Sequence, residues 1–369
     1  MNKKKVLFTV HEFYPEVGGS GEVVYRIARR LVQRGFEVTV ATRYTSCRKA
    51  NCHEGIKITD FKIGGNKVKG YLAEQKEINR YLNFLIQGDF DVMINYAAQS
   101  WCSDLAFENI GRIKAKKILI PCGYSGLKDP RYWGYFRWLP KVLKDYDSLV
   151  YLSDTYQDIV YHRKHQLKNA IMIPNGADET EFLAPVSVDV RKKYGISSKY
   201  LAICVSNFFI LKGQDFVIRA FNKMKTQDVT LVLIGSQKFP PYFRFISWLA
   251  RKNKHIKFLE SIPRAETIDF YKQSDFFLFG SRVECSPLVM FESFAARTLF
   301  LTRNVGNTAE YRDYGVLVGT PKEMSRKIDF YVANPGLLEA QVDKAHLKYL
   351  KDHTYEVLAK KYEDLILSL

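Results

Sequence analysis

The sequence predicts an α/β fold made of two similar halves, each with a parallel sheet. Three observations predict it: apolar runs that do not alternate with polar residues, helical patterns between those runs, and a restart of the same order midway along the chain. Non-alternating runs of this length are typical of strands buried on both faces. A strand, a helix and a strand in succession form a βαβ unit with parallel strands.

The first half shows this pattern near the N-terminus. Residues 23–34 separate the first two apolar runs, and their apolar positions follow helical spacing. The expected strands of this half are Val6–Val10, Val38–Ala41, Val92–Ile94, Ile118–Ile120, Leu149–Leu152 and Ile171–Ile173.

The second half restarts with a strand, a helix over 216–221 and another strand, and it ends in an expected helix over 350–369. A polar stretch with Pro185 and Gly195 lies before the restart, so we expect domains at 1–182 and 183–369. The expected strands here are Leu201–Val205, Val229–Ile234, Ile256–Phe258, Phe276–Phe279 and Leu299–Thr302.

Length and charge agree with a two-domain protein. The 369 residues suffice for two domains and for a large core without disulfides. The net charge is +17, and it divides into +8 for residues 1–182 and +9 for residues 183–369. Such an excess favours an anionic partner: nucleic acid, an anionic lipid surface or a phosphorylated small molecule. The even division argues against a basic nucleic-acid tail.

Several classes of protein are excluded. The apolar run 6–10 is too short for a secretory signal, and no stretch approaches the ~18 apolar residues of a membrane span. The six cysteines are scattered without a C-x-x-C pair, which indicates reduced thiols and no zinc. We therefore expect a cytoplasmic protein.

A glycine-containing segment, Pro15–Gly21, lies between the first expected strand and helix. Small residues let the backbone approach a ligand, and a helix N-terminus with free N–H groups suits a phosphate. The spacing matches neither a P-loop nor G-x-G-x-x-G, so an ordinary turn is the alternative.

Two shorter motifs follow later in the chain. Pro174-Asn175-Gly176 after a strand indicates a turn. Lys212-Gly213 stands at a loop-to-helix junction, where the ammonium group is placed either beside a diphosphate or in solvent.

The most specific motif is a pair of glutamates, Glu284 and Glu292, separated by seven residues. Ser286-Pro287 suits an N-cap followed by proline at the first helical position. Glu284 then lies in the loop and Glu292 on the second helical turn. One carboxylate suits sugar hydroxyls and the other a ribose diol, while the helix N-terminus faces negative charge. The alternative is one charge in a loop and one on the exposed face of a helix, and it is the better interpretation of an isolated pair.

Taken together and in order, these segments resemble the retaining glycosyltransferases of family 4, also called group 1. The resemblance covers nearly the whole chain. The matching segments are Pro15–Gly19, Gly35–Val38, Ile173–Asp178, Lys212-Gly213, Glu284–Glu292 and Asn304–Tyr311.

The resemblance implies a GT-B fold: two Rossmann-like, doubly wound domains that face each other across a cleft, with the terminal helix returning to the N-terminal domain. The N-terminal domain would bind the acceptor and the C-terminal domain the nucleotide-sugar donor. Fixed N–H dipoles and a cation would replace a divalent metal, so no metal and no cofactor is expected.

The resemblance also assigns roles to residues. Glu292 would bind the ribose, and Glu284, with the backbone of Ser286, Pro287 and Leu288, would hold the donor sugar. Lys212 and the amides of Gly18 and Gly19 would stabilise the departing diphosphate. We therefore expect Glu284 and Lys212 to be catalytic.

Two departures from the family pattern affect the site. Asn207 stands where the family has an arginine, and Arg282 is a candidate to supply the missing charge. The strand at 92–94 is not followed by the family's histidines. Polar Asn95, Tyr96 and Gln99 stand there instead, as candidates to contact the sugar or acceptor.

Two segments, 131–144 and 242–254, combine cations with aromatic residues. They are typical of amphipathic domain helices, of membrane-surface contacts or of nucleic-acid surfaces. No nucleic-acid motif accompanies them, so we expect no nucleic-acid partner. An anionic membrane surface stays open, with a peripheral location on the inner face of the plasma membrane.

The predicted function is metal-independent, retaining transfer of a sugar from a UDP- or GDP-linked donor to a saccharide or lipid-linked acceptor, in cell-surface glycan biosynthesis. One alternative is a non-catalytic partner subunit that binds a nucleotide sugar. The other is a dinucleotide-dependent enzyme, which the missing fingerprint disfavours.

Overall fold

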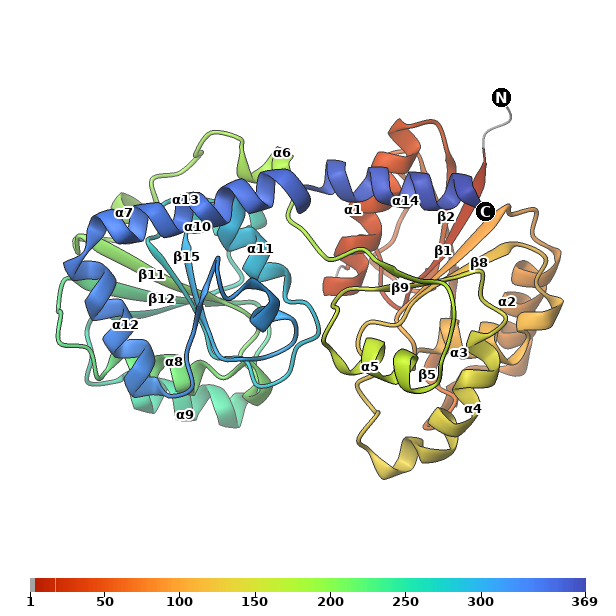
Figure 1. Ribbon diagram of the computed structural model, residues 1–369, viewed down its shortest axis with the longest axis horizontal. Helices are drawn as coiled ribbons and strands as arrows, with labels where there is room; N and C mark the ends of the chain where they lie inside the picture. Colours follow the sequence, from red (N-terminus) through yellow and green to blue (C-terminus); the bar gives the residue numbers. More distant parts are fainter. Residues whose placement is uncertain (1–3, 17) are drawn as a thin grey trace. The chain divides into compact units, whose positions relative to one another are not determined.

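The computed structural model describes residues 4–16 and 18–369. They form two compact units, which Figure 1 shows in sequence colours. The first unit comprises the chain up to Pro174 together with Tyr355–Leu369, and the second comprises Asn175–Thr354. The chain therefore passes between the units twice. The expected boundary, after residue 182, lies further along the chain, because Phe182 packs on Tyr271 of the second unit at 5.7 Å between ring centroids.

The described residues of the first unit contain an eight-stranded sheet. Its pairs are parallel except for the one between β3 and β4. The six strands expected from the sequence all lie in it. In spatial order the strands are β10 (Ala170–Met172), β9 (Ser148–Tyr151), β8 (Lys116–Ile120), β7 (Val92–Tyr96), β1 (Lys5–Thr9), β2 (Glu37–Arg43), β4 (Ile56–Phe61) and β3 (Cys52–His53).

The chain order reverses direction at the centre of this sheet. From β1 it moves to β2, whereas from β7 it moves the opposite way to β8. Because such crossovers are right-handed, the two directions place helices on opposite faces, which defines a doubly wound sheet. The helices are α1 (Gly19–Gln33), α2 (Gln75–Gln87), α3 (Trp101–Glu108), α4 (Trp133–Leu143), α5 (Gln157–Lys164) and α14 (Tyr355–Ser368).

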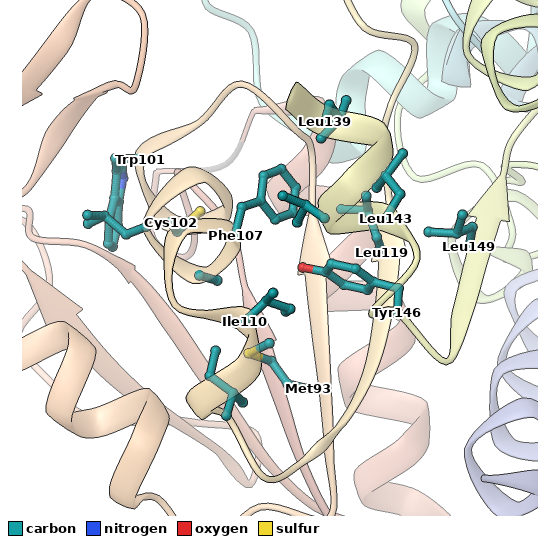
Figure 2. Close-up of a cluster of buried hydrophobic side chains, with 14 of the residues drawn as sticks. Met93, Trp101, Cys102, Phe107, Ile110, Leu119, Leu139, Leu143, Tyr146 and Leu149 are labelled. Atoms are coloured by element: carbon teal, nitrogen blue, oxygen red, sulfur yellow. The ribbon is translucent and has the colours of Figure 1, made fainter. Parts of the chain in front are cut away.

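One face of this sheet packs against α2 to α5. Figure 2 shows part of the cluster, in which Trp101 and Phe107 of α3 and Leu139 and Leu143 of α4 surround side chains from the strands. A short hairpin, β5 (Gly64–Asn66) and β6 (Gly70–Leu72), precedes α2. The sequence does not predict this hairpin, because its glycine-rich strands contain no apolar run.

The second unit contains a six-stranded sheet in its described residues, with every pair parallel. Its chain order reverses between β11 and β14, so this sheet is also doubly wound. The five strands expected from the sequence are present. In spatial order the strands are β13 (Ile256–Glu260), β12 (Val229–Gly235), β11 (Tyr200–Val205), β14 (Phe276–Phe279), β15 (Leu299–Thr302) and β16 (Val316–Leu317).

Two hydrophobic clusters form the core of the second unit, with alternate strand residues in each. Ala202 and Leu231 belong to one cluster, and Leu201 and Val232 belong to the other. The helices are α6 (Glu179–Phe182), α7 (Val190–Lys193), α8 (Gln214–Phe221), α9 (Pro240–Ala250), α10 (Arg264–Lys272), α11 (Leu288–Ala295), α12 (Pro321–Ala333) and α13 (Pro335–Asp352).

The expected terminal helix over 350–369 is in fact the end of α13 and the whole of α14, with a break at His353 and Thr354. The break is the point at which the chain returns to the first unit, where α14 packs on α1. The Arg34 guanidinium lies 2.5 Å from carboxylate oxygens of both Glu356 and Glu363, and it ties the two helices together.

Within residues 4–16 and 18–369, no helix is long and apolar enough to cross a membrane.

Candidate functional site

The second unit has a site candidate at its switch point, between β11 and β14. In doubly wound sheets the loops diverge at this point and leave a crevice at the carboxyl ends of the strands. The loop after β11 carries Lys212 and the loop after β14 carries Glu284. The fold thus brings together the two residues that the sequence predicts to be catalytic.

Lys212 and Glu284 form an ion pair. The Lys212 Nζ lies 2.8 Å from Glu284 Oε1, and Ser281 Oγ donates to the same oxygen at 2.7 Å. The Glu284 side chain is 15% exposed and that of Lys212 is 35% exposed. The pair is thus held in place but remains accessible to a ligand.

Two glycines bring the loops into backbone contact. Gly213 has a φ of +64°, and an ideal Cβ on it would lie only 2.0 Å from the carbonyl oxygen of Gly280. Any side chain at Gly213 would therefore separate the loops. Two hydrogen bonds to the Leu211 carbonyl, from the Arg282 amide at 2.8 Å and from Ser281 Oγ at 3.1 Å, complete the junction.

The helix α11 begins next to Glu284. Its N-cap is Pro287, which makes no side-chain cap, so the expected N-cap at Ser286 is one residue too early. The physical reason is that Ser286 bonds outside the helix: its Oγ accepts from Asn307 Nδ2 at 3.0 Å and its carbonyl from Asn175 Nδ2 at 2.9 Å. The first two amides of α11, those of Leu288 and Val289, have no carbonyl partner within the helix and carry partial positive charge, whereas the Met290 amide donates to the Pro287 carbonyl at 3.2 Å.

Glu292 lies on the second turn of α11, as predicted, with its side chain 9% exposed. Arg264 of α10 donates to Oε1 at 2.6 Å and the Tyr271 hydroxyl donates to Oε2 at 2.7 Å. Arg264 also lies 3.1 Å from Glu181. Sequence reasoning missed Arg264 and Tyr271, because no motif marks them and they are distant from Glu292 in the chain.

Asn207 stands where the family has an arginine, and Arg282 is the candidate to supply its charge. Both residues bond to other parts of the second unit. Asn207 Oδ1 accepts from the amides of Ser236 and Gln237, at 3.3 and 3.0 Å, and so supports the loop after β12. The Arg282 guanidinium binds both oxygens of Asp215, at 2.9 and 2.7 Å. This hydrogen-bonded pair raises the pKa of Arg282. In this structure the charge of Arg282 is therefore balanced by the carboxylate of Asp215.

In the first unit the glycine segment lies between β1 and the start of α1, as the sequence predicts. Val17 lies outside the described residues, Gly18 is the N-cap of α1 and Gly19 is its first residue. An ideal Cβ on Gly18 would lie 3.2 Å from Glu12 Oε2. Glu12 also lies 3.5 Å from Arg43, so charged groups that the sequence did not single out stand at the carboxyl ends of β1 and β2.

The structure corrects part of the acceptor-side prediction. Asn95 and Tyr96 are fully or almost fully buried, because β7 extends to Tyr96 and places both residues inside the sheet. The side chain of Asn95 donates from Nδ2 to Thr9 Oγ1 at 2.8 Å, and its Oδ1 accepts from the Tyr146 hydroxyl at 2.5 Å. Neither side chain has surface to offer a sugar.

Gln99 is different, because it lies in the loop after β7 and is partly exposed. Its backbone has a φ of +61°, and its Oε1 accepts from the Gly126 amide at 3.1 Å. Gln99 therefore ties the loops after β7 and β8 together.

In the part of the chain that the structure describes, no group of three or more His, Cys, Asp or Glu side chains is placed to hold a metal ion.

Comparison with known proteins gives the class of protein to which this geometry belongs. The family model "Glycosyl transferases group 1" matches residues 188–348, and the model "Glycosyltransferase Family 4" matches residues 17–181. The chain therefore belongs to the group 1 glycosyltransferases of family 4 and is an enzyme of the glycosyltransferase class.

Relatives of known name cover most of the chain. An N-acetyl-alpha-D-glucosaminyl L-malate synthase of Bacillus anthracis is 26% identical over 82% of this chain and 80% of its own. The GPI3 subunit of a phosphatidylinositol N-acetylglucosaminyltransferase, from Saccharomyces cerevisiae strain YJM789, is 21% identical over 81% of this chain and 67% of its own.

Solved structures show the same fold. A sucrose-phosphate synthase of Thermosynechococcus elongatus has a TM-score of 0.80, 15% identity, and coverage of 99% of both chains. The Anabaena protein HepE in complex with UDP and glucose has a TM-score of 0.79 and 15% identity, over 99% of this chain and all of its own. The predicted GT-B fold class is thereby confirmed.

Proposed function

We propose that this enzyme transfers a sugar from a UDP- or GDP-linked donor to a saccharide or lipid-linked acceptor, with retention of anomeric configuration and without a divalent metal. The observation that carries the proposal is the Lys212–Glu284 pair at the switch point of the second unit, beside the N-terminus of α11.

The charges at this site suit a diphosphate leaving group. An ammonium group and the free amides of a helix N-terminus are fixed positive groups, which stabilise negative charge as it develops on the β-phosphate. Lys212 is bound to Glu284 in this structure, so we propose that it turns from the carboxylate to the phosphate when the donor binds. Glu284, thus released, accepts hydrogen bonds from hydroxyls of the donor sugar.

We assign Glu292 to the ribose of the nucleotide. Its carboxylate is oriented by Arg264 and Tyr271, and a carboxylate can accept more hydrogen bonds than the two that it has here. Arg264 and Tyr271 are then positioning residues for this contact.

A retaining reaction at this site needs no protein base. In a front-face mechanism the acceptor hydroxyl attacks on the side of the leaving diphosphate. The bond between the anomeric carbon and the phosphate oxygen breaks, the glycosidic bond to the acceptor oxygen forms, and a phosphate oxygen takes the hydroxyl proton. Asn95 and Tyr96, which stand where the family has histidines, are buried and cannot act as such a base. In this mechanism the task of the first unit is to hold the acceptor.

The relatives narrow the choice of donors to test. Two of them are named for the transfer of an N-acetylglucosaminyl group, and a neighbour of the same fold binds UDP. We therefore expect a donor panel to give the strongest thermal shift with a UDP-sugar, and UDP-N-acetylglucosamine is the first to examine.

The test is turnover of the selected donor by the wild-type enzyme and by Glu292→Gln. Glutamine keeps the size of the side chain, whereas alanine would leave the buried Tyr271 hydroxyl without its acceptor. We expect at least a 100-fold loss of kcat/KM with an unchanged fold. Wild-type turnover in this variant would contradict the assignment.

Two further measurements address the finer claims. The product's anomeric proton coupling in NMR is expected to match that of the donor, and inversion would contradict the mechanism. Activity is expected to persist in EDTA, and loss that added Mg²⁺ or Mn²⁺ restores would show a metal requirement.

A second candidate is a non-catalytic subunit that binds a nucleotide sugar, because one relative is named as a subunit of a transferase. Release of nucleotide from the donor, in the presence of acceptor or water, would exclude this candidate.

A further inference from the structure

The solvent face of α9 in the second unit carries two large aromatic side chains. The opposite face packs into the core through Tyr242, Ile246 and Ala250. Phe245 and Trp248 are 39% and 57% exposed, and their rings are stacked with centroids 6.5 Å apart and planes 15° apart. Because the exposure of apolar surface to water is unfavourable, burial of this aromatic pair against a partner would lower the free energy.

Cations surround the aromatic pair. The Arg219 guanidinium of α8 lies 5.9 Å from the ring centroid of Phe245, and that of Arg251 lies 4.5 Å from the centroid of Trp248. Lys252 and Lys254 are exposed just beyond the helix. We call these six residues the α9 patch: Arg219, Phe245, Trp248, Arg251, Lys252 and Lys254.

The charge of the α9 patch is not balanced locally. Residues 236–259 contain six lysines and arginines and no aspartate or glutamate. Among the residues placed by the structure, none of the four cations of the patch lies within ion-pair distance of a carboxylate. The patch therefore attracts an anionic partner.

A groove of about 800 Å³ adjoins the patch. Most of its lining side chains are cationic, amide or aromatic, among them Asn222, Gln227, Trp248, Arg251, Lys252 and His255, and Leu249 adds an aliphatic wall. Side chains of this kind donate hydrogen bonds, as the binding of a phosphate group requires.

The groove is separate from the Lys212–Glu284 site. Gln227 and His255 stand just before the amino ends of β12 and β13, whereas Lys212 and Glu284 follow the carboxyl ends of β11 and β14. Figure 1 shows α9 beside α8 at the rim of the second unit. A ligand in the groove therefore does not compete with the donor.

We propose that the α9 patch binds the surface of an anionic lipid bilayer. Phe245 and Trp248 enter the level of the headgroups, where aromatic rings are favoured, and the four cations bind lipid phosphates. Two exposed rings on one helix, with cations from α8 and from the segment after α9 around them, favour a planar surface over a folded protein or a nucleic acid. The surface acts in addition to the proposed sugar transfer and does not depend on it.

Flotation of the full chain with lipid vesicles tests this proposal. We expect binding to vesicles of equimolar phosphatidylcholine and phosphatidylglycerol, and at least tenfold weaker binding to phosphatidylcholine alone. The triple variant R251E/K252E/K254E is expected to lower the partition coefficient by about 100-fold or more, since each cation near the surface contributes about fivefold. The double variant F245A/W248A is expected to lower it by about tenfold.

The matched control lies on α12 of the same unit. Lys322, Arg326, Lys327 and Phe330 are exposed there, so K322E/R326E/K327E makes the same change in net charge and F330A removes an exposed ring. Both controls are expected to keep vesicle binding within twofold. The melting temperature and the donor-induced thermal shift of each variant are expected to match those of the wild type.

Three outcomes would overturn the proposal. An equal loss of binding in the two triple variants would show a general charge effect. A loss with W133A, which removes the exposed tryptophan of α4, but not with F245A/W248A would place the lipid contact elsewhere. Binding of single-stranded RNA through the patch without vesicle binding would identify a nucleic-acid surface.

Discussion

The two units have the same kind of sheet but equip their switch points differently. In the second unit, a lysine and a glutamate from the loops after adjacent strands form an ion pair, and two glycines bring these loops into backbone contact. In the first unit, the equivalent point between β1 and β7 has Gly18 at the start of α1, and the polar residues of β7 are buried.

In the proposed function, the two switch points have different tasks. The second unit fixes charged groups in advance, as the stabilisation of a developing negative charge requires. At the switch point of the first unit, the N-terminus of α1 at Gly18 stands beside Glu12, which lies 3.5 Å from Arg43, and the proposed function assigns this side to the acceptor. The net charge is +10 for residues 1–174 with 355–369 and +7 for residues 175–354, so both units are basic and the arrangement of charged groups distinguishes their switch points.

The largest effect is expected at the ion pair. Lys212→Ala removes the only side-chain cation that we assign to the diphosphate, so kcat/KM should fall by about 100- to 1000-fold in a steady-state assay. Lys223→Ala, an exposed lysine after α8, is the matched control and should leave activity unchanged. If Lys212→Ala kept its activity and Glu12→Gln in the first unit lost it, the contrast between the units would be reversed.

The next effect concerns the glycines of the two switch points. Gly213→Ala should destabilise the second unit by about 2–4 kcal/mol, because its φ is positive and its Cβ would collide with the Gly280 carbonyl. Hydrogen exchange of β11 and β14 measures this loss. Gly195→Ala has a φ of +59° but open space around it, so it should cost about 1 kcal/mol.

Gly18→Ala provides the comparison in the first unit. Its φ is −88°, and the added methyl group would meet only the end of the flexible Glu12 side chain. Stability should therefore change by less than about 1 kcal/mol. Equal destabilisation by Gly18→Ala and Gly213→Ala would show that both loops are equally constrained.

A third prediction concerns pH and the first unit. Burial raises the pKa of Asp104 to about 6, whereas it is about 4 in the unfolded chain. The folded state thus binds a proton that the unfolded state releases, so this group favours folding fully below pH ~4 and loses that contribution as the pH rises to ~6. The contribution lost is on the order of 2–3 kcal/mol.

Urea unfolding followed by tryptophan fluorescence measures this dependence, because Trp101, Trp133 and Trp138 of the four tryptophans lie in the first unit. Asp104→Asn should flatten the slope between pH 4 and 6. An unchanged slope would show that Asp104 is ionised in the folded protein at these pH values.

The smallest effect is expected where α14 packs on α1. Arg34→Ala breaks two ion pairs and should loosen α14 by about 1 kcal/mol, seen as faster hydrogen exchange in residues 355–368. Lys360→Ala is the control, because its ion pairs stay within α14 and are exposed. Equal effects of the two variants would show that Arg34 does not hold the helix.

The sequence predicted most of the fold and only part of the site. Strands such as β11 and β12 were predictable because both faces are buried, which produces uninterrupted apolar runs. The end of β7 was not, because polar Asn95 and Tyr96 find hydrogen-bond and packing partners inside the sheet and so continue the strand.

The site shows the same division. Lys212 and Glu284 were predictable because each belongs to a motif next to a strand, and adjacent parallel strands bring their carboxyl ends together. The contact of Arg264 with Glu292 depends on how α10 packs beside α11, and no local pattern in the chain specifies that packing.

The second unit is an insertion within the first. Its two ends meet, since the Ala177 amide donates to the His353 carbonyl at 3.0 Å and the two segments pair at Ala177 and Thr354. During synthesis on the ribosome, all of the second unit emerges before α14, which completes the first. We therefore expect that the second unit can fold before the first, which needs α14 to cover the face of α1 against which it packs.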